Sequence, residues 1–491
     1  MRKPFILAID QGTTSTRAML FDAEARPCAS HAIELRQHYP ANGWIEHDPL
    51  EIWQAALAAS RAVLEGREVR DVAAIGIANQ RETTVVWERE SGRPLHNAIV
   101  WQDRRTADRC AALKAQGLEA KVAARTGLLL DPYFSATKIG WILDHVAGAR
   151  GRAQAGELCF GTIDSWLVYK LTEGRVHASD VTNASRTLLL DLKRLAWDEE
   201  MLSLFGVPQA MLPELGDSAG AFGETRLFGG TIPILGCAGD QQAAAFGQAC
   251  FAKGDVKSTY GTGCFALVNT GDAAPVSQNK LLGTCAYRIG SDKAYAIEGS
   301  IFVAGAVVQW LRDSLGVIES AADVEALAAR AKPAEGLYFV PAFTGLGAPY
   351  WHPEARGAIL GLTRDMGAAE IARAALDAVC FQTCDLLAAM ARDMGAQELA
   401  RLKVDGGMVK NDGFCQRLAD LTGLEVDRPQ VTETTALGAA YLAGLAAGLF
   451  KDTADIAARW ALERRFAPKL SASARDGLYR GWQQAIARVR G

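Results

Sequence analysis

The chain has 491 residues, and its 52 basic and 56 acidic side chains leave a formal net charge of −4. Because the two signs are interspersed along the chain, no basic face exists for a nucleic-acid partner, and such partners are not expected. The length exceeds that of one ordinary hydrophobic core and favours two domains, which we place at residues 1–250 and 251–491.

Membrane insertion and export are not expected either. Only five apolar residues, Phe5 to Ile9, precede Asp10, which is too few for the core of a signal peptide. The apolar stretch Leu437 to Phe450 is shorter than the ~20 residues that span a bilayer and predicts a buried helix. The ten cysteines include no Cys-x-x-Cys pair, which indicates reduced thiols in a cytoplasmic protein.

Residues 5–22 predict two apolar strands joined by a polar turn rich in Gly and Thr. Such a turn directs backbone N–H groups and hydroxyls to one point, and this arrangement binds phosphate. Thr13 and Thr14 add hydroxyl donors, and Arg17 adds a fixed positive charge. The carboxylate of Asp10 suits a Mg²⁺ shell, through water. The alternative is an ordinary hairpin turn capped by Asp10.

The segment Asn79 to Thr84 lies between two predicted strands, Val72–Ala78 and Val85–Trp87. Adjacent residues of a regular strand face opposite sides, so Arg81 and Glu82 can meet one ligand only if the chain turns there. Together they would supply the donors and acceptors that a ligand with several hydroxyl groups needs. The alternative is an ion pair on the surface.

Asp240 stands between a predicted strand, residues 232–239, and a predicted helix that begins at Asp240 itself. The dipole of that helix would stabilise the charged carboxylate, which makes Asp240 our choice for a general base. The alternative is a plain helix cap.

The second half repeats the opening device, with predicted strands on either side of the turn Gly261-Thr262-Gly263. Further on, residues 402–405 predict a short strand, and residues 371–390 and 412–421 predict helices. Gly406 and Gly407 follow that strand and would let a flat base or a ribose approach closely. The alternation of strands and helices predicts the α/β class.

With these motifs, the chain resembles the FGGY carbohydrate kinases across essentially its whole length, and most of all their branch that acts on glycerol. The motifs that carry the resemblance are Asp10–Arg17, Asn79–Thr84, Trp101–Thr106, Asp131–Thr137, Cys237–Gly247, Tyr260–Phe265, Pro341–Trp351 and Asp405–Asn411, with the two family signatures at Phe134–His145 and Gly357–Asp377. The resemblance implies an actin-like fold, in which two ribonuclease-H-like domains enclose a central cleft. It also implies ATP and Mg²⁺ as cofactors, glycerol as the acceptor, sn-glycerol 3-phosphate as the product, and a homodimer or homotetramer.

The same resemblance implies a role for each matching residue. Glycerol would be held by hydrogen bonds from Arg81, Glu82, Tyr133, Asp240 and Gln241, with Trp101 and Phe265 against its carbon edge. The nucleotide phosphates would be bound by Thr13, Thr14 and Ser15, with Arg17 and Thr262 nearby. The pocket for the nucleoside would be lined by Gly305, Gln309, Gly407 and Asn411. Asp240 would be the base, and Asp10 would orient the Mg²⁺ shell.

Two other functions stay open at this point. One is a kinase of the same family that acts on another polyol or a ketose. The other is a non-catalytic or chaperone ATPase with an actin-like fold, although such a protein would not need the residues around Arg81. The loop Gly229-Gly230-Thr231 is shorter than in relatives inhibited by fructose 1,6-bisphosphate, so we expect no such inhibition.

Overall fold

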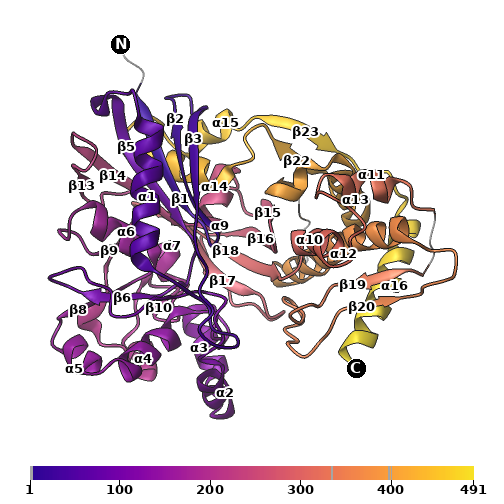
Figure 1. The fold of residues 1–491 in the computed structure, drawn as a ribbon, viewed down its shortest axis with the longest axis horizontal. Coiled ribbons are helices and arrows are strands. Elements are labelled where there is room, and N and C mark those ends of the chain that lie inside the picture. Colours follow the sequence, from indigo (N-terminus) through magenta and orange to yellow (C-terminus); the bar gives the residue numbers. More distant parts are fainter. Residues whose placement is uncertain (1–3, 333–335, 396–398, 400) are drawn as a thin grey trace.

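The computed structural model describes residues 4–332, 336–395, 399 and 401–491. The chain forms two halves, each built around a β-sheet with helices on its faces (Figure 1). The N-terminal half is drawn in indigo to magenta and the C-terminal half in orange to yellow, with the two sheets meeting in the middle of the molecule.

The first sheet has six strands in the order β13-β14-β5-β1-β2-β3. Its strands are β1 (Phe5–Gln11), β2 (Ser15–Phe21), β3 (Pro27–Glu34), β5 (Val72–Asn79), β13 (Glu224–Thr225) and β14 (Ile232–Gly239). Two helices that pack on it are α1 (Pro49–Leu64) and α6 (Ile163–Leu171). Strands β5 and β14 run parallel to β1, whereas β2 pairs with β1 antiparallel, so the predicted hairpin of residues 5–22 is confirmed.

Smaller elements extend the first half on one side of this sheet (Figure 1). The short strand pairs are β4 (Glu46–His47) with β7 (Ala98–Ile99), β6 (Val85–Glu88) with β8 (Leu158–Gly161), β9 (Ala178–Asp180) with β12 (Glu214–Gly216), and β10 (Leu190–Asp191) with β11 (Ala196–Trp197). The helices here are α2 (Ala107–Ala115), α3 (Glu119–Thr126), α4 (Ser135–His145), α5 (Ala149–Gln154), α7 (Val181–Ala184) and α8 (Glu199–Phe205).

The second sheet repeats the plan of the first, with seven strands in the order β17-β18-β16-β15-β21-β22-β23. They are β15 (Val256–Tyr260), β16 (Cys264–Gly271), β17 (Leu282–Ile289), β18 (Asp292–Ile301), β21 (Leu402–Asp405), β22 (Val426–Pro429) and β23 (Leu462–Phe466). Here β15 and β16 form the antiparallel hairpin, β21 is parallel to β15, and β22 is parallel to β21. The repeated opening device therefore reflects a repeated topology.

The core of the second half is built from apolar faces of this sheet and of the helices around it. Its elements include α10 (Gly305–Asp313), α11 (Asp323–Ala329), α12 (Ala368–Asp393), α13 (Asp412–Thr422), α16 (Ala472–Arg490) and the pair β19 (Tyr338–Val340) with β20 (Ala358–Leu360). Helix α15 (Thr453–Arg459) instead contributes Ile456 to another apolar cluster, which contains residues of β1 and β2. Helix α12 is longer than predicted, because Glu370 caps it by accepting from the backbone N–H of Gly367. It is long and apolar enough to cross a membrane, yet 83% of its most apolar window is buried in this core.

Two helices cross between the halves. Helix α9 (Asp240–Gly247) leaves the first sheet, and α14 (Thr434–Ala446), from the far end of the chain, packs on β1, β5 and β14. Their backbones touch: a Cβ on Gly438 would lie 1.8 Å from the carbonyl oxygen of Ala243. The predicted buried helix within Leu437–Phe450 is thus α14, and it joins the halves.

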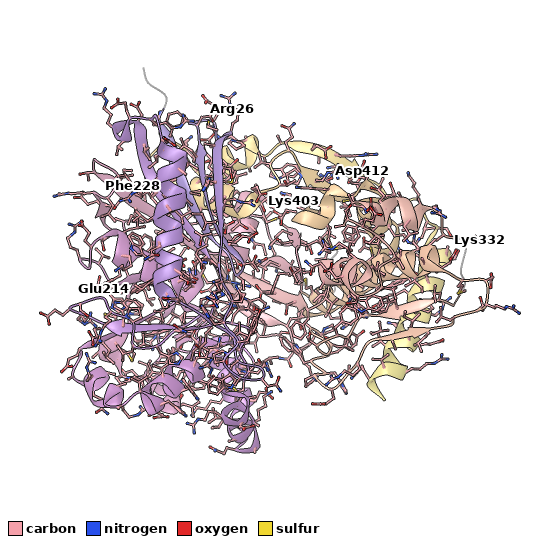
Figure 2. All side chains as sticks on the ribbon, viewed as in Figure 1. Arg26, Glu214, Phe228, Lys332, Lys403 and Asp412 are labelled. Atoms are coloured by element: carbon pink, nitrogen blue, oxygen red, sulfur yellow. The ribbon has the colours of Figure 1, made fainter. Side chains whose placement is uncertain are left out.

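Side chains fill both halves and the space between them (Figure 2). Lys403, labelled between the halves in that view, donates from β21 to the carbonyl oxygens of Gln248 and Ala249, just after α9, at 2.7 and 3.1 Å. All ten cysteines are free thiols. No group of three or more His, Cys, Asp or Glu side chains that suits a metal ion occurs within the described ranges.

Candidate active site

Three parallel strands of the first sheet end at the same edge. Gln11 of β1 lies opposite Asn79 of β5, and Asn79 lies opposite Gly239 of β14. The residues that end or follow these strands therefore gather at one place, which is where parallel α/β sheets carry their ligands. They include Asp10, the segment after Asn79, and Asp240.

The chain turns sharply at Glu82, which has a positive φ of 61°. This conformation is uncommon for residues other than glycine and is found preferentially at functional sites. The side chains of Arg81 and Glu82 are each only 2% exposed, so the alternative of a surface ion pair is wrong. Arg81 instead contacts Asp240 and Glu298, and Glu82 contacts Arg186.

Asp240 is the first residue of α9, as predicted, although Gly239 occupies the cap position. Its Oδ1 atom accepts from the backbone N–H of Gln241 at 2.7 Å and lies 3.0 Å from Nε of Arg81. Its Oδ2 atom accepts no hydrogen bond from any residue that the structure describes, and the side chain is 28% exposed. One carboxylate oxygen is thus fixed, while the other is free to meet a ligand.

One face of the second sheet lies against this edge. Residues directly opposite each other on neighbouring strands share a face, and the pairs Lys257↔Leu267 and Leu267↔Glu298 place Lys257 and Glu298 on one face. Phe265 lies two residues before Leu267 and therefore faces the same way. The ammonium group of Lys257 donates to Oε1 of Gln241 and, at 2.8 Å, to Thr259. Burial lowers the pKa of Lys257.

An aromatic wall completes the polyol side that the sequence predicts. The ring of Trp101 lies 5.5 Å from that of Tyr133 and 6.0 Å from that of Phe265, centroid to centroid. The guanidinium of Arg81 lies 6.0 Å from the centroid of the Phe265 ring. Burial raises the pKa of Tyr133 well above its usual value, so its hydroxyl stays protonated. The seven side chains that we predicted for the polyol are therefore brought together.

The predicted phosphate turn lies beside this wall. Trp101 donates from Nε1 to the hydroxyl of Thr13 at 2.9 Å. Within the described ranges the backbone N–H groups of Thr13 and Thr14 have no acceptor, as an anion-binding turn requires. Arg17 pairs with Glu433, just before α14, a partner that the sequence did not indicate. Ser15 begins β2 at the end of the turn.

Asp10 lies close enough to Asp240 for their charges to interact. Burial, the nearby Asp240 carboxylate and Glu433 raise the pKa of Asp10 to about 7, against the opposing effect of Arg17. The positive charge of Arg17 therefore does not offset burial and the two neighbouring carboxylates.

The predicted nucleoside residues lie around the second turn. Gly305, the first residue of α10, donates its backbone N–H to the carbonyl of Gly261, and a Cβ on it would lie 2.6 Å from that oxygen. The same Cβ would lie 3.7 Å from Met408, the neighbour of Gly407. Ala304 and Ala306, on either side of Gly305, donate to the carbonyl of Thr262. The second turn and the start of α10 are thus in contact, and the chain segment that contains Gly407 lies close to them.

The other two residues predicted for the nucleoside, Gln309 and Asn411, differ in their surroundings. Gln309 is exposed one helical turn beyond Gly305. Asn411 caps α13, because its Oδ1 atom accepts from the backbone N–H of Phe414 at 2.7 Å. The side-chain oxygen of Asn411 is therefore already engaged.

Four charged residues of the site were missed by the sequence analysis: Arg186, Lys257, Glu298 and Glu433. A usable signal existed for two of them. Lys257 and Glu298 are flanked within their strands by uncharged residues, and a charge inside a buried strand is rare unless it has a partner. Arg186 and Glu433 lie outside strands and helices and carry no comparable signal.

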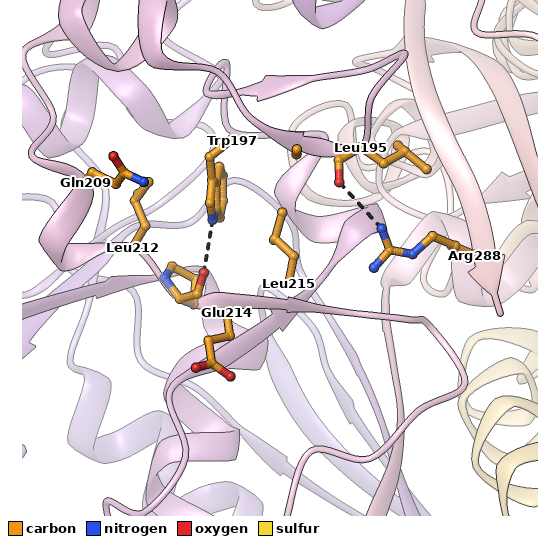
Figure 3. Close-up of a pocket in the computed structure, with 9 residues that line it drawn as sticks. Leu195, Trp197, Gln209, Leu212, Glu214, Leu215 and Arg288 are labelled. Atoms are coloured by element: carbon orange, nitrogen blue, oxygen red, sulfur yellow. Dashed lines mark hydrogen bonds between the residues drawn. The ribbon is translucent and has the colours of Figure 1, made fainter. Parts of the chain in front are cut away.

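A surface cavity lies elsewhere on the molecule. It measures about 410 Å³ and is lined by nine residues that include Trp197, Leu215 and Arg288. Figure 3 shows Trp197 donating to a backbone oxygen and Arg288 reaching the carbonyl of Leu195. None of the lining residues belongs to the predicted site.

Comparison with known sequences identifies the family. Residues 5–247 match the N-terminal domain, and residues 256–447 the C-terminal domain, of the FGGY family of carbohydrate kinases. A glycerol kinase from Methylobacterium nodulans is 60% identical over 487 residues, which cover 98% of this chain and 97% of that protein. Glycerol kinase 1 from Pseudomonas aeruginosa is 58% identical over 490 residues, 99% of either chain.

Solved structures show the same fold. The crystal structure of Plasmodium falciparum glycerol kinase with ADP matches with a TM-score of 0.93 at 35% identity, over 99% of this chain and 98% of that one. A ligand-bound xylulose kinase from Lactobacillus acidophilus, at 23% identity and a TM-score of 0.88 over 99% of both chains, shares the fold. The expected actin-like α/β fold is confirmed.

Proposed function

The chain belongs to the FGGY family of carbohydrate kinases, and within that family we propose that it transfers the terminal phosphoryl group of ATP to glycerol. The observation that carries this proposal is the free Oδ2 atom of Asp240, because Arg81 and the backbone of Gln241 occupy only Oδ1. Arg81, which contacts Oδ1 of this carboxylate, lies 6.0 Å from the centroid of the Phe265 ring, so a hydroxyl group bound at Oδ2 would be near side chains of both halves. Relatives named glycerol kinase, about 60% identical over the full length, support glycerol as the acceptor.

We assign the polyol contacts from the geometry of the site. Arg81 and Gln241 donate to hydroxyl oxygens, Glu82 and Asp240 accept, and the protonated Tyr133 can do either. Lys257 fixes Gln241, because its ammonium donates to the amide oxygen and leaves the amide NH₂ for the ligand. Trp101 and Phe265 cover the carbon edge and exclude water, which would otherwise compete as the nucleophile.

The reaction then follows from these positions. The glycerol oxygen attacks the terminal phosphorus, the bond from that phosphorus to the bridging oxygen breaks, and ADP leaves with the bond's electron pair. The hydroxyl proton passes to Oδ2 of Asp240. Phosphoryl transfer is commonly loose, so the proton leaves late and a weak base suffices. The products are glycerol 3-phosphate and ADP, and we propose the sn-3 position.

The Asp10 region fits Mg²⁺. Burial, and after it the charge of the nearby Asp240 carboxylate, raise the pKa of Asp10 to about 7, and a divalent cation would favour the charged form of both carboxylates. Asp10 would hold Mg²⁺ through water. When bound, Mg²⁺ neutralises charge on the phosphate oxygens. The hydroxyls and backbone N–H groups of Thr13, Thr14 and Ser15 would bind those oxygens.

For the nucleotide we propose the second turn and its neighbours. Thr262 would meet the phosphates, and Gly305, Gln309, Gly407 and Asn411 would line the nucleoside. The absence of a side chain at Gly407, which has nothing within 4 Å of a Cβ position, supports a close approach. We also propose residues 1–250 and 251–491 as the two domains, a homo-oligomeric assembly, and a cytoplasmic location.

A coupled assay of ADP release tests the proposal. We expect ADP to form with Mg²⁺-ATP only when glycerol is present, and glycerol to give the highest kcat/KM in a panel of small polyols and ketoses. ADP release that ignores every polyol would favour the partner-driven ATPase instead. A higher kcat/KM for a ketose would reassign the substrate within the family.

A further inference from the structure

Three of the polyol side chains belong to a row of five charges of alternating sign. In order, they are Glu82, Arg186, Glu298, Arg81 and Asp240. The nitrogen–oxygen distances between neighbours in this row are 2.6, 2.8, 2.5 and 3.0 Å. The first four side chains are at most 2% exposed, whereas Asp240 is 28% exposed. The row therefore begins in the interior and ends at the proposed base.

Glu298 is the centre of this row. One of its oxygens accepts from Arg186 and the other accepts from Arg81, so a single carboxylate binds two guanidinium groups. Burial works to raise the pKa of Glu298, but Arg186 and Arg81 outweigh it and hold the pKa below its usual value. Glu298 is thus charged, and it is paired on both sides as a buried charge must be.

Glu298 also reaches across the molecule. It lies on β18 of the second sheet, whereas Arg81 and Glu82 follow β5 of the first sheet. Arg186 follows α7 in the first half and packs over the rings of Tyr133 and Phe134, at 5.7 and 5.4 Å from their centroids. One residue of the second half therefore fixes three polyol-binding side chains of the first: Arg81 directly, and Glu82 and Tyr133 through Arg186.

We propose that Glu298 is a positioning residue that sets the polyol specificity of this kinase. This inference rests on the proposed function. With Glu298 in place, Arg81 is drawn inward and meets Asp240 through Nε at Oδ1 alone, which keeps Oδ2 open for the hydroxyl. Without the Glu298 charge, Arg81 turns its fork to both oxygens of Asp240, and Arg186 is left with Glu82 as its sole anion. Both changes act on glycerol and leave the nucleotide turns untouched.

The variant Glu298→Gln keeps the size of the side chain and removes its charge. We expect the KM for glycerol to rise roughly tenfold or more, with a fall in kcat, because Arg81 and Arg186 each lose one of the two anions that orient them. The KM for ATP should stay within about twofold of the wild type. We further expect a smaller preference for glycerol over propane-1,2-diol, which lacks one terminal hydroxyl. The reason is that misplaced donors no longer form a good hydrogen bond with that hydroxyl.

The matched control is Asp377→Asn, which breaks the two-pronged pair of Asp377 with Arg417 between α12 and α13, at 2.7 Å in both contacts. It removes a charge from a largely buried pair outside the site, so it should lower thermal stability without changing the glycerol KM selectively. Equal rises of both KM values in Glu298→Gln, or a glycerol KM within about twofold of the wild type, would overturn the proposal.

A further variant covers the case in which Glu298→Gln does not fold. Glu298→Asp keeps the charge but is shorter, so it cannot reach both arginines, and it should show the same selective rise in the glycerol KM. If neither variant folds, the row of charges serves the stability of the whole chain and the proposal is overturned. Wild-type protein that neither binds glycerol in calorimetry nor phosphorylates it would instead defeat the proposed function, and this inference with it.

Discussion

The two carboxylate oxygens of Asp240 have different roles: one makes structural contacts and the other is available for the reaction. Oδ1 is held by Arg81 and by the first turn of its own helix, and these contacts orient Oδ2 toward the ligand. The alternative of a plain helix cap is weakened by the position itself, because Gly239 is the cap residue and Asp240 lies inside the helix.

The variant Asp240→Asn should therefore lower kcat by roughly 10²- to 10⁴-fold, the usual contribution of a positioned base. The amide oxygen can keep both structural contacts of Oδ1, but the NH₂ group then occupies the position of Oδ2 and cannot take a proton. Steady-state kinetics should show little change in the KM for ATP. Turnover close to that of the wild type would remove Asp240 from the mechanism.

The sequence indicated the positions of residues that lie within a recognisable motif. It did not indicate charged partners that are far away along the chain. Arg81, Glu82 and Asp240 follow strand ends, and the need for a turn at Glu82 was inferred and then found as a positive φ. Glu298 lies 217 positions from Arg81, so no local pattern connects them. The partners of Arg81 and Glu82 were also misassigned in the surface alternative, because the two residues pair with Glu298 and Arg186 rather than with each other.

At the level of helices and strands, the crossing of α9 and α14 decides how the site is held. A Cβ on Gly438 would lie 1.8 Å from the carbonyl oxygen of Ala243. Such a clash can be removed only if the backbone of one helix moves. Since α9 begins at Asp240, any such movement carries the proposed base with it.

We expect Gly438→Ala to lower the free energy of unfolding by about 1–3 kcal/mol, as overpacked cores do, and to reduce kcat as well. Gly477→Ala in α16 is the matched control, because the nearest atom to its Cβ is the end of the Arg480 side chain at 4.0 Å. That change should be neutral or slightly stabilising, as Ala is in an open helix position. Chemical unfolding measures both variants, and equal stability of the two would contradict the role of the crossing.

Some element boundaries were predictable: β14 and β21 coincide with their predicted ranges and α9 with its predicted start, whereas α12 extends beyond its predicted range at both ends. Apolar runs bounded by polar turns carry that information locally. The attachment of α14 to the first sheet was not predictable, because a helix with apolar residues on all sides does not reveal which sheet it covers.

The whole molecule consists of two halves of repeated topology, and the site is assembled from both. The first half contributes Arg81, Glu82 and Asp240, and the second contributes Phe265, Glu298 and Lys257. A movement of the halves would therefore change the polyol contacts and the phosphate turns together, which is how such enzymes keep water from the reaction. The repeat was visible in the sequence as two similar turns, whereas the contact between the halves required the structure.

The most direct test of this account is a crystal structure of the protein with glycerol and a non-hydrolysable ATP analogue. We predict a terminal hydroxyl of glycerol about 2.6–3.2 Å from Oδ2 of Asp240, the reach of a general base, and in line with the terminal phosphorus. The carbon edge should lie against Trp101 and Phe265, with Arg81 on a second hydroxyl. Glycerol bound elsewhere, such as in the cavity beside Trp197 and Arg288, or bound with every hydroxyl turned away from Asp240, would contradict the account.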